Sequence, residues 1–219
     1  SKGLFNKINL GLTSSRIQKT TVSTNQLKRA LGLYKLSFTQ ANTNKKQQSN
    51  FNIVGLSKSQ ISELINQFYP NRNENLPKQR PKRYMLYRLL YFGFVLLVII
   101  NIGLYFLPVQ FELLNILVVL LIVASAWMIY DKTYYQVDAD YIVRGGGGLV
   151  ETWTSLLELH KTQAIEIKQT FFQKQRHLAH LVIHSASNSI TIPHINKTEA
   201  IYLSNCILYL VESKDKDWM

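Results

Sequence analysis

Histidines are the residues whose spacing in this sequence most suggests chemistry. His177, His180 and His184 lie close together in a segment with the alternation of a β-strand. In a strand, His180 and His184 would point to one face and His177 to the other. Two histidines can bind a metal ion, but no acidic or cysteine cluster lies nearby to complete a site. Because His160 and His194 add little to this pattern, we predict ordinary sheet histidines and no bound metal.

A run of four glycines, Gly145 to Gly148, has the composition of a phosphate-binding loop. Such loops lead into a helix and carry a Lys or Ser at a fixed spacing. The residues that follow, Leu149 to Thr154, instead indicate a strand, so the run predicts a hairpin or bulge turn. The sequence also lacks a nucleophile elbow, a paired-carboxylate frame and a His-metal motif. We therefore predict neither an enzyme nor a bound cofactor.

Two sets of polar residues are candidates for binding contacts. The first set would contact lipid headgroups or serve only to orient membrane spans. It comprises Lys78, Arg80, Lys82, Arg83 and Arg88. The second set would contact a partner or a neighbouring module, or shape a sheet through hydrogen bonds. It comprises Arg16, Gln18, Lys161, Gln163, Gln169 and Gln173. The structural role is favoured for the second set, because part of it recurs at equivalent places in two segments.

The positive charge lies at one end of the chain. The formal net charge is +12, and residues 1–88 alone carry 16 Lys+Arg against 2 Asp+Glu. A basic region beside an apolar span is attracted to anionic lipid, at about 1 kcal/mol per Lys or Arg near the surface. The same charge attracts nucleic acid, but the apolar centre favours the membrane as partner. The single Cys206 excludes an internal disulfide.

The centre of the chain predicts a transmembrane hairpin. Residues 89–111 and 113–130 contain no charged side chain, and about 20 apolar residues cross the hydrocarbon core as a helix. Pro108 breaks the apolar run between them, and Asn101 and Asn115 are placed to bond across the two helices. Basic residues flank the pair and are missing from its loop, so the positive-inside rule puts both ends in the cytoplasm.

The two flanks of the hairpin are repeats. With a shift of 145 residues, Gln18 aligns with Gln163 and Leu36 with Leu181. Each copy reads as several strands followed by one helix. The helices begin after Ser57 and after Asn196 with capping-box spacing, and the second presents Ala200, Leu203, Ile207 and Leu210 on one face. The first copy lacks counterparts of the first two strands and the chain begins with Ser, so we expect the C-terminal part of a longer protein.

A family resemblance follows from these segments. The order is a hairpin, a Tyr-rich strand pair, a glycine run, then residues 161–169 (KTQAIEIKQ) and 175–181 (QRHLAHL). In the first copy, residues 16–18 (RIQ) and 27–33 (LKRALGL) match the corresponding positions. The chain resembles the bacterial PH-like membrane proteins of the YdbS/YdbT-like family. The resemblance covers nearly the whole chain and implies a PH-like fold, a bent antiparallel sheet or barrel closed by a C-terminal helix.

The predicted fold class is therefore α+β, with two PH-like modules flanking a two-helix transmembrane hairpin. The domains are a shortened first module at residues 1–69, a basic linker at 70–84, the hairpin at 85–130 and a complete second module at 131–219. The expected location is the inner cell membrane, multi-pass, with both termini cytoplasmic.

By resemblance, we expect a non-enzymatic scaffold or interaction protein of the cell envelope, in a membrane stress response. Its partners would be the lipid bilayer and other membrane proteins or copies of itself, and not nucleic acid. One alternative is anionic headgroup binding by the basic first module. A second is a subunit of a membrane transporter or enzyme complex, disfavoured because the spans lack ionisable residues.

Overall fold

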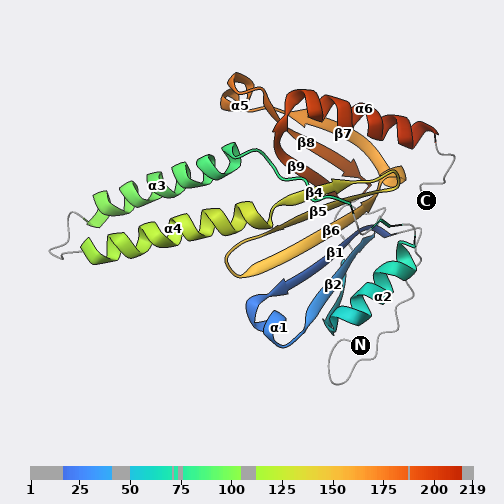
Figure 1. The fold of residues 1–219 in the computed structure, drawn as a ribbon, viewed down its shortest axis with the longest axis horizontal. Coiled ribbons are helices and arrows are strands. Elements are labelled where there is room, and N and C mark those ends of the chain that lie inside the picture. The colour runs from blue at the N-terminus through green and yellow to red at the C-terminus, as the bar shows by residue number, and fades with distance from the viewer. Residues whose placement is uncertain are drawn as a thin grey trace.

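The computed structural model describes residues 17–40, 50–70, 72–73, 76–104, 112–186 and 188–213. Two long helices, α3 (Tyr84–Leu104) and α4 (Glu112–Lys132), extend side by side from a body of sheets and shorter helices (Figure 1). Each has 21 residues, or about 31 Å at 1.5 Å per residue, which matches a hydrocarbon core of roughly 30 Å. Both are long and apolar enough to cross a membrane. They begin one residue before and end two residues after the predicted hairpin; Pro108 lies outside the described residues.

Two contacts hold the long helices together. Asn115 Nδ2 donates to Asn101 Oδ1 at 2.8 Å, which confirms the predicted bond between the helices. Gly93 allows a close approach, because a Cβ placed there would lie 2.3 Å from Ile122 Cγ2. Small residues and interhelical hydrogen bonds are the usual means of helix association in lipid, where no hydrophobic effect drives it.

Nine strands in the described residues form two antiparallel sheets. The larger sheet has the order β3-β2-β1-β6-β5-β4 and the smaller has the order β7-β8-β9. The larger contains β1 (Ile17–Asn25), β2 (Tyr34–Gln40), β3 (Asn50–Leu56), β4 (Tyr134–Val137), β5 (Tyr141–Gly147) and β6 (Glu151–Glu158). The smaller contains β7 (Thr162–Lys168), β8 (Leu178–Ser185) and β9 (Ser189–Asn196).

The same order of elements occurs on both sides of the hairpin. A strand, a short helix, two strands and a longer helix follow one another twice. The short helices are α1 (Gln26–Ala30) and α5 (Phe171–Gln175), and the longer ones are α2 (Lys58–Phe68) and α6 (Lys197–Ser213). The pairing β1–β2 is irregular between Ile17 and Lys19, and the pairing β7–β8 between Thr162 and Ala164. These irregularities are 145 residues apart, the spacing at which the sequence repeats.

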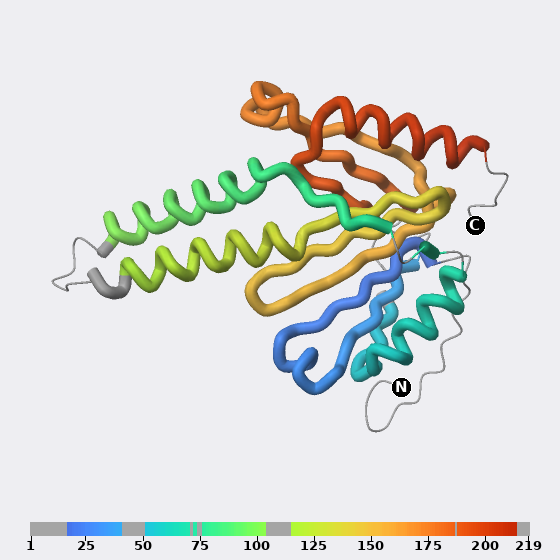
Figure 2. The backbone as a smooth tube through the Cα atoms, in the orientation of Figure 1, coloured from blue at the N-terminus to red at the C-terminus, as the bar shows by residue number. Residues whose placement is uncertain are grey.

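The strand β1 pairs along β6, with Thr21 opposite Ser155. The first flank lacks counterparts of the first two strands, which predicts an open sheet edge; for β1 that prediction is wrong, because β6 covers the edge. The two strands are far apart in the sequence. The alternation of apolar and polar residues shows which face of a strand is buried, but it does not show which other strand lies beside it. Figure 2 shows how the two flanks meet in this one sheet, at one end of the pair of long helices.

The strands β5 and β6 are buried on both faces. Tyr141, Val143 and Leu156 pack on one face against Ile61 and Ile65 of α2. Their neighbours Ile142 and Leu157 point to the other face and pack against β8, β9 and α6. Since successive side chains alternate across a strand, these strands serve two hydrophobic cores at once.

The glycine run is mainly strand, which corrects the prediction of a turn. Gly145, Gly146 and Gly147 belong to β5, and the chain reverses at residues 148–150. A Cβ at Gly145 would lie 2.0 Å from Tyr134 Cε1, and one at Gly146 would lie 2.6 Å from Trp153 Cζ2. Glycine is therefore needed because aromatic rings lie directly over the backbone.

The helix predictions are largely confirmed. Ser57 and Gln60 form the predicted capping box of α2. In α6, Ala200 and Ile207 are buried, and Leu203 and Leu210 pack against the same cluster. Glu199 accepts a hydrogen bond from the Tyr135 hydroxyl, which ties the first turn of α6 to β4.

Candidate functional site

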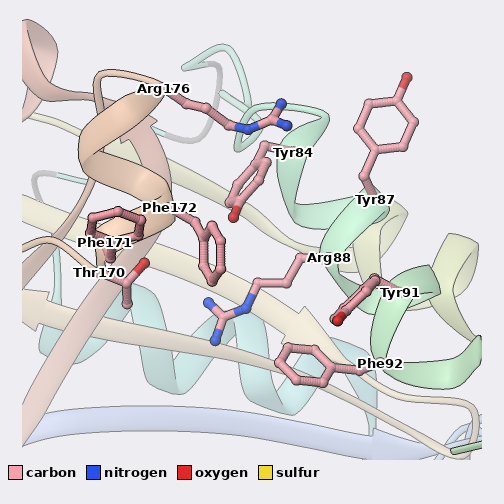
Figure 3. Close-up of a pocket in the computed structure, with 9 residues that line it drawn as sticks. All are labelled: Tyr84, Tyr87, Arg88, Tyr91, Phe92, Thr170, Phe171, Phe172 and Arg176. Carbon is pink, nitrogen blue, oxygen red and sulfur yellow. The ribbon is translucent and has the colours of Figure 1, made fainter. Parts of the chain in front are cut away.

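A pocket lies where the first turns of α3 approach the short helix α5. Its volume is about 790 Å³. The lining is aromatic with two arginines: Tyr84, Tyr87, Arg88, Tyr91, Phe92, Thr170, Phe171, Phe172 and Arg176 (Figure 3). Ligand pockets commonly combine such apolar walls with a few convergent polar groups.

The helix α5 carries one wall of the pocket. It is fixed at its start by a capping box, in which the Thr170 N–H donates to Gln173 Oε1 at 2.9 Å. This short turn leaves Phe171 and Phe172 at 71% and 65% exposure, with their rings edge to face. Two neighbouring exposed phenylalanines are unusual on a surface that faces water, so this wall is suited to an apolar environment.

The pocket's positive charge comes from two arginines. The Arg88 guanidinium lies over the Phe92 ring at 5.5 Å, and that of Arg176 over the Tyr84 ring at 5.0 Å. Figure 3 shows Arg88 directed into the space between α5 and Phe92. In the described part of the chain, neither arginine forms an ion pair with an acidic side chain. Both are therefore positioned to bind an anion.

Behind Arg88 lies a buried network centred on Gln173. The Gln173 Nε2 atom is 2.8 Å from His180 Nε2 and 2.9 Å from His194 Nδ1. Because Oε1 of the same amide accepts from the Thr170 N–H, Nε2 is the donor toward His194 Nδ1. His180 Nδ1 also faces the His194 backbone N–H at 3.3 Å, so the His180 ring accepts either there or at Nε2 from Gln173. Both histidines must then be neutral. Burial, the mutual effect of the two rings and the Arg88 charge lower the pKa of His194 to about 4, and burial with Arg88 and Arg144 lowers that of His180.

The network leaves two donors facing each other. With Nδ1 accepting from Gln173, His194 carries its proton on Nε2, and this atom lies 3.4 Å from Arg88 Nη1. A neutral imidazole cannot accept at both nitrogens, so this contact is not a good hydrogen bond. An oxygen anion between the two groups would accept from both. The network thus lacks a hydrogen-bond acceptor at the place where Arg88 meets the pocket.

The structure separates the first predicted set of basic residues. Arg88 lines the pocket. Lys78 lies over the Tyr134 ring at 4.7 Å, and Arg80 pairs with Asp131 at 2.8 Å. Lys82 and Arg83 are exposed immediately before α3.

Most residues of the second set have structural roles. Gln173 organises the histidine network, and Gln169 donates to the Leu178 carbonyl at 2.6 Å. Buried Lys161 pairs with Glu158 and donates to the Ile17 carbonyl at 2.7 Å, so it joins the two flanks. Gln18 is also buried and Gln163 is exposed. Arg16 lies outside the described residues.

Sequence reasoning missed His194, Arg176 and the two phenylalanines of α5. The signal available was the pair Phe171-Phe172 in a polar stretch between strands, since adjacent aromatic residues there have no core to enter. His194 has a positive φ of 50°, which no local pattern predicts. Among the residues described, no group of three or more His, Cys, Asp or Glu side chains is placed to hold a metal ion.

Comparison with known families identifies a domain in the second part of the chain. Residues 92–211 match the model of the bacterial PH domain, over the range from α3 to α6. Comparisons with curated proteins and with solved structures gave no match. The matched range covers more than half of the chain and contains β4 to β9, all of α5 and α6 up to residue 211. With that match and this arrangement of strands and closing helix, the chain belongs to the bacterial PH domain family.

Proposed function

We propose that this chain is a non-enzymatic integral membrane protein that binds an anionic phospholipid in the pocket between α3 and α5. The observation that carries the proposal is the position of Arg88 and Arg176 among aromatic side chains at the base of an apolar helix. A guanidinium group is a planar fork of N–H donors well suited to the oxygens of a phosphate. Aromatic walls suit the glycerol and upper acyl regions of a lipid, where Tyr and Trp normally gather.

The unpaired donors support an anionic ligand over a neutral one. Arg88 Nη1 lies 3.4 Å from the protonated Nε2 of His194. A phosphate oxygen there would satisfy both groups, whereas water would leave the Arg88 charge without a counter-ion.

The proposed orientation places both flanks in the cytoplasm at the inner membrane. The pairing of β1 with β6 requires residues before and after the hairpin to be on one side of the bilayer. Lys82, Arg83 and Arg88 near the start of α3, and Lys132 at the end of α4, give that side its positive charge.

The proposal changes where headgroup binding is expected. The sequence pointed to the basic first module, but the pocket is formed by α3 and α5. We also propose that the flanks are two PH-like modules of a YdbS/YdbT-like protein, supported by the repeated order of elements and the matching irregularities. The scaffold role in the cell envelope stays a prediction; lipid binding is preferred because it has a pocket of matching chemistry.

The test is lipid retention by the full chain. The protein is extracted in mild detergent, loaded with phosphatidylglycerol or phosphatidylcholine, and analysed by native mass spectrometry. Arg88→Gln and Arg176→Gln should each reduce bound phosphatidylglycerol about tenfold, because a charge-assisted hydrogen bond contributes about 1.5–3 kcal/mol. Lys82→Gln and Arg83→Gln remove equal charge outside the pocket and should retain the lipid. Equal retention by all four variants would refute a specific site.

A further inference from the structure

We infer that the cytoplasmic body also rests on the bilayer through a three-point face, formed by α1, the β5–β6 loop at residues 148–150, and α5. The partner is the anionic surface of the leaflet into which the hairpin inserts. This inference rests on the proposed membrane insertion and goes beyond the pocket, because two of the three points belong to other elements.

The first point is the β5–β6 loop, and strand lengths fix its height. Strand β4 leaves the end of α4, and β5 returns beside it with Tyr134 opposite Gly145. Gly146 and Gly147 therefore extend past the start of β4, by about 3.3 Å per residue. Lys132 Nζ, in the last turn of α4, donates to the Gly148 carbonyl at 2.6 Å. The loop thus lies at the level where α4 leaves the membrane.

The second point is α1, which lies beside this loop. Asn25 is opposite Glu151 in the β1–β6 pairing. The Gln26 N–H donates to the Val150 carbonyl at 3.2 Å, and Gln26 Nε2 donates to the Leu149 carbonyl at 2.8 Å. The β1–β6 pairing and these bonds hold α1 at the same end of the sheet.

The third point is α5, which lines the pocket together with the first turns of α3. Figure 1 shows α1, the β5–β6 loop and α5 at the end of the body from which α3 and α4 extend, and the β4–β5 turn at the opposite end. The strand directions require this arrangement, because β1, β5 and β7 all run toward the hairpin end.

Each of the three elements exposes apolar side chains at its surface. Leu27 in α1 and Leu31, which caps its C-terminus, are 79% and 73% exposed, and Val150 in the loop is 65% exposed. The phenylalanines of α5 are similarly exposed. On a surface facing water, three such sites would be costly, and their position on the membrane side gives them a common apolar phase.

Charge identifies the partner as an anionic bilayer surface. Lys28 and Arg29 lie in α1, and Lys174 and Arg176 lie in and just after α5. Apolar side chains flanked by basic ones are the signature of segments that lie in the interface of anionic membranes. The positions of the three points at the base of the hairpin favour the bilayer over a second copy of the chain.

The experiment places a fluorescent probe on each point. In the 219-residue chain carrying Cys206→Ser, single cysteines at Leu27, Val150 or Phe172 are labelled with the environment-sensitive dye NBD. The protein is reconstituted in phosphatidylcholine–phosphatidylglycerol vesicles that contain a lipid spin-labelled near the headgroup. All three probes should shift to the blue and be strongly quenched. A probe at Ala139, in the β4–β5 turn, should show neither effect.

Two controls separate the possible failures. A probe at Ile99, an exposed position within α3, reports insertion of the hairpin itself in vesicles whose lipid is spin-labelled on the acyl chain instead of near the headgroup. If Ile99 is quenched and the three points are not, the docking face is wrong while membrane insertion stands. If Ile99 is also unquenched, the proposed function fails and this inference with it. A blue shift without quenching that disappears on diluting protein in lipid would identify a second copy as the partner and overturn the inference.

A charge-reversal variant tests the role of the basic residues. Lys28→Glu combined with Arg29→Glu should reduce quenching at Leu27 and leave quenching at Phe172 largely intact, since the two points are on separate elements. Replacing phosphatidylglycerol by phosphatidylcholine should reduce quenching at both. Unchanged quenching at Leu27 in the charge-reversed variant would refute the electrostatic part of the inference.

Discussion

The rings of His180 and His194 pack edge to face with centroids 4.4 Å apart, and Gln173 Nε2 lies within hydrogen-bonding distance of a nitrogen of each. The three residues come from β8, β9 and α5, so the contact joins the smaller sheet to the helix that lines the pocket. Arg88 of α3 adds a fourth element to the same cluster. The histidines thus connect the start of α3 with the smaller sheet and α5.

This histidine network should make the stability of the folded protein dependent on pH. The pKa of His194 is lowered to about 4 and that of His180 is also lowered, so the folded protein keeps both rings neutral. The unfolded chain takes up protons below the ordinary value of 6.5. The stabilisation is therefore complete above about pH 6.5 and is lost as pH falls toward 4. Melting of the full chain in detergent, measured between pH 8 and 4, should show this loss.

His194→Asn is the matched variant for that measurement, since Asn tolerates the positive φ at this position. It should lower the melting temperature at pH 8 and reduce its fall toward pH 5. His184→Asn, on the partly exposed side of β8, should retain the full pH dependence. A parent-like pH profile for His194→Asn would show that His194 does not contribute the effect.

Gln173→Leu should weaken the histidine network without adding volume to it. Gln173 is completely buried, and its loss would leave ring nitrogens and the Thr170 N–H without partners. Each unsatisfied buried group costs about 1–3 kcal/mol. Thermal unfolding should show a clear loss for this variant and almost none for Gln175→Leu at the exposed end of α5. Similar melting temperatures for the two variants would contradict the network.

Lys161 should contribute more than an ordinary surface lysine. It is buried, pairs with Glu158 at 2.8 Å and donates to the Ile17 carbonyl. Lys161→Met removes charge-assisted bonds of about 1.5–3 kcal/mol. Lys168→Met breaks an exposed pair with Glu166 and should cost at most about 1 kcal/mol. Chemical unfolding of both variants compares these values, and a larger loss for Lys168→Met would exclude the proposed joining role.

The β1–β6 pairing can be tested by a disulfide. Thr21 lies opposite Ser155, and their hydroxyls are 2.9 Å apart. Opposite residues of antiparallel strands have Cα atoms about 4.5–5.5 Å apart, within disulfide range. With Cys206→Ser, the pair Thr21→Cys and Ser155→Cys should oxidise readily, as seen by a mobility shift. Thr21→Cys with Thr152→Cys, three positions out of register, should not. Efficient oxidation of the second pair alone would show a different register.

Membrane topology gives the remaining prediction. In cells carrying Cys206→Ser protein, Val109→Cys should react with a membrane-impermeant maleimide added from outside. Ala139→Cys, in the exposed β4–β5 turn, should react only after the cells are opened. This follows from the positive-inside rule. Labelling of both positions from one side would exclude the hairpin.

Features with a local cause were predicted well. The apolar length of α3 and α4, the Ser57 capping box and the buried stripe of α6 all follow from residues near one another in sequence. The bond between Asn115 and Asn101 was also within reach, because two polar residues in an apolar hairpin have few other partners.

Features set by distant contacts were not predictable. The strands β1 and β6 pair across the whole hairpin, and both faces of β6 are buried. The glycines of β5 look like a turn until the rings of Tyr134 and Trp153 are seen above them. The pocket depends on α3 and α5, which lie far apart in the chain, so only Arg88 of its charged residues was identified in advance.

The shared sheet also links folding to the order of biosynthesis. Residues 17–25 leave the ribosome before either long helix, whereas their partner strand at residues 151–158 follows both. If the long helices span the membrane as proposed, the edge of the early strand that pairs with β6 stays unpaired until the chain has crossed the bilayer and returned, although its other edge can already pair with β2. A nascent chain that inserted only one helix would hold the two strands in different compartments, and its unpaired edge would be open to aggregation or proteolysis. Under the proposed topology, completion of this sheet therefore requires that both long helices have been inserted.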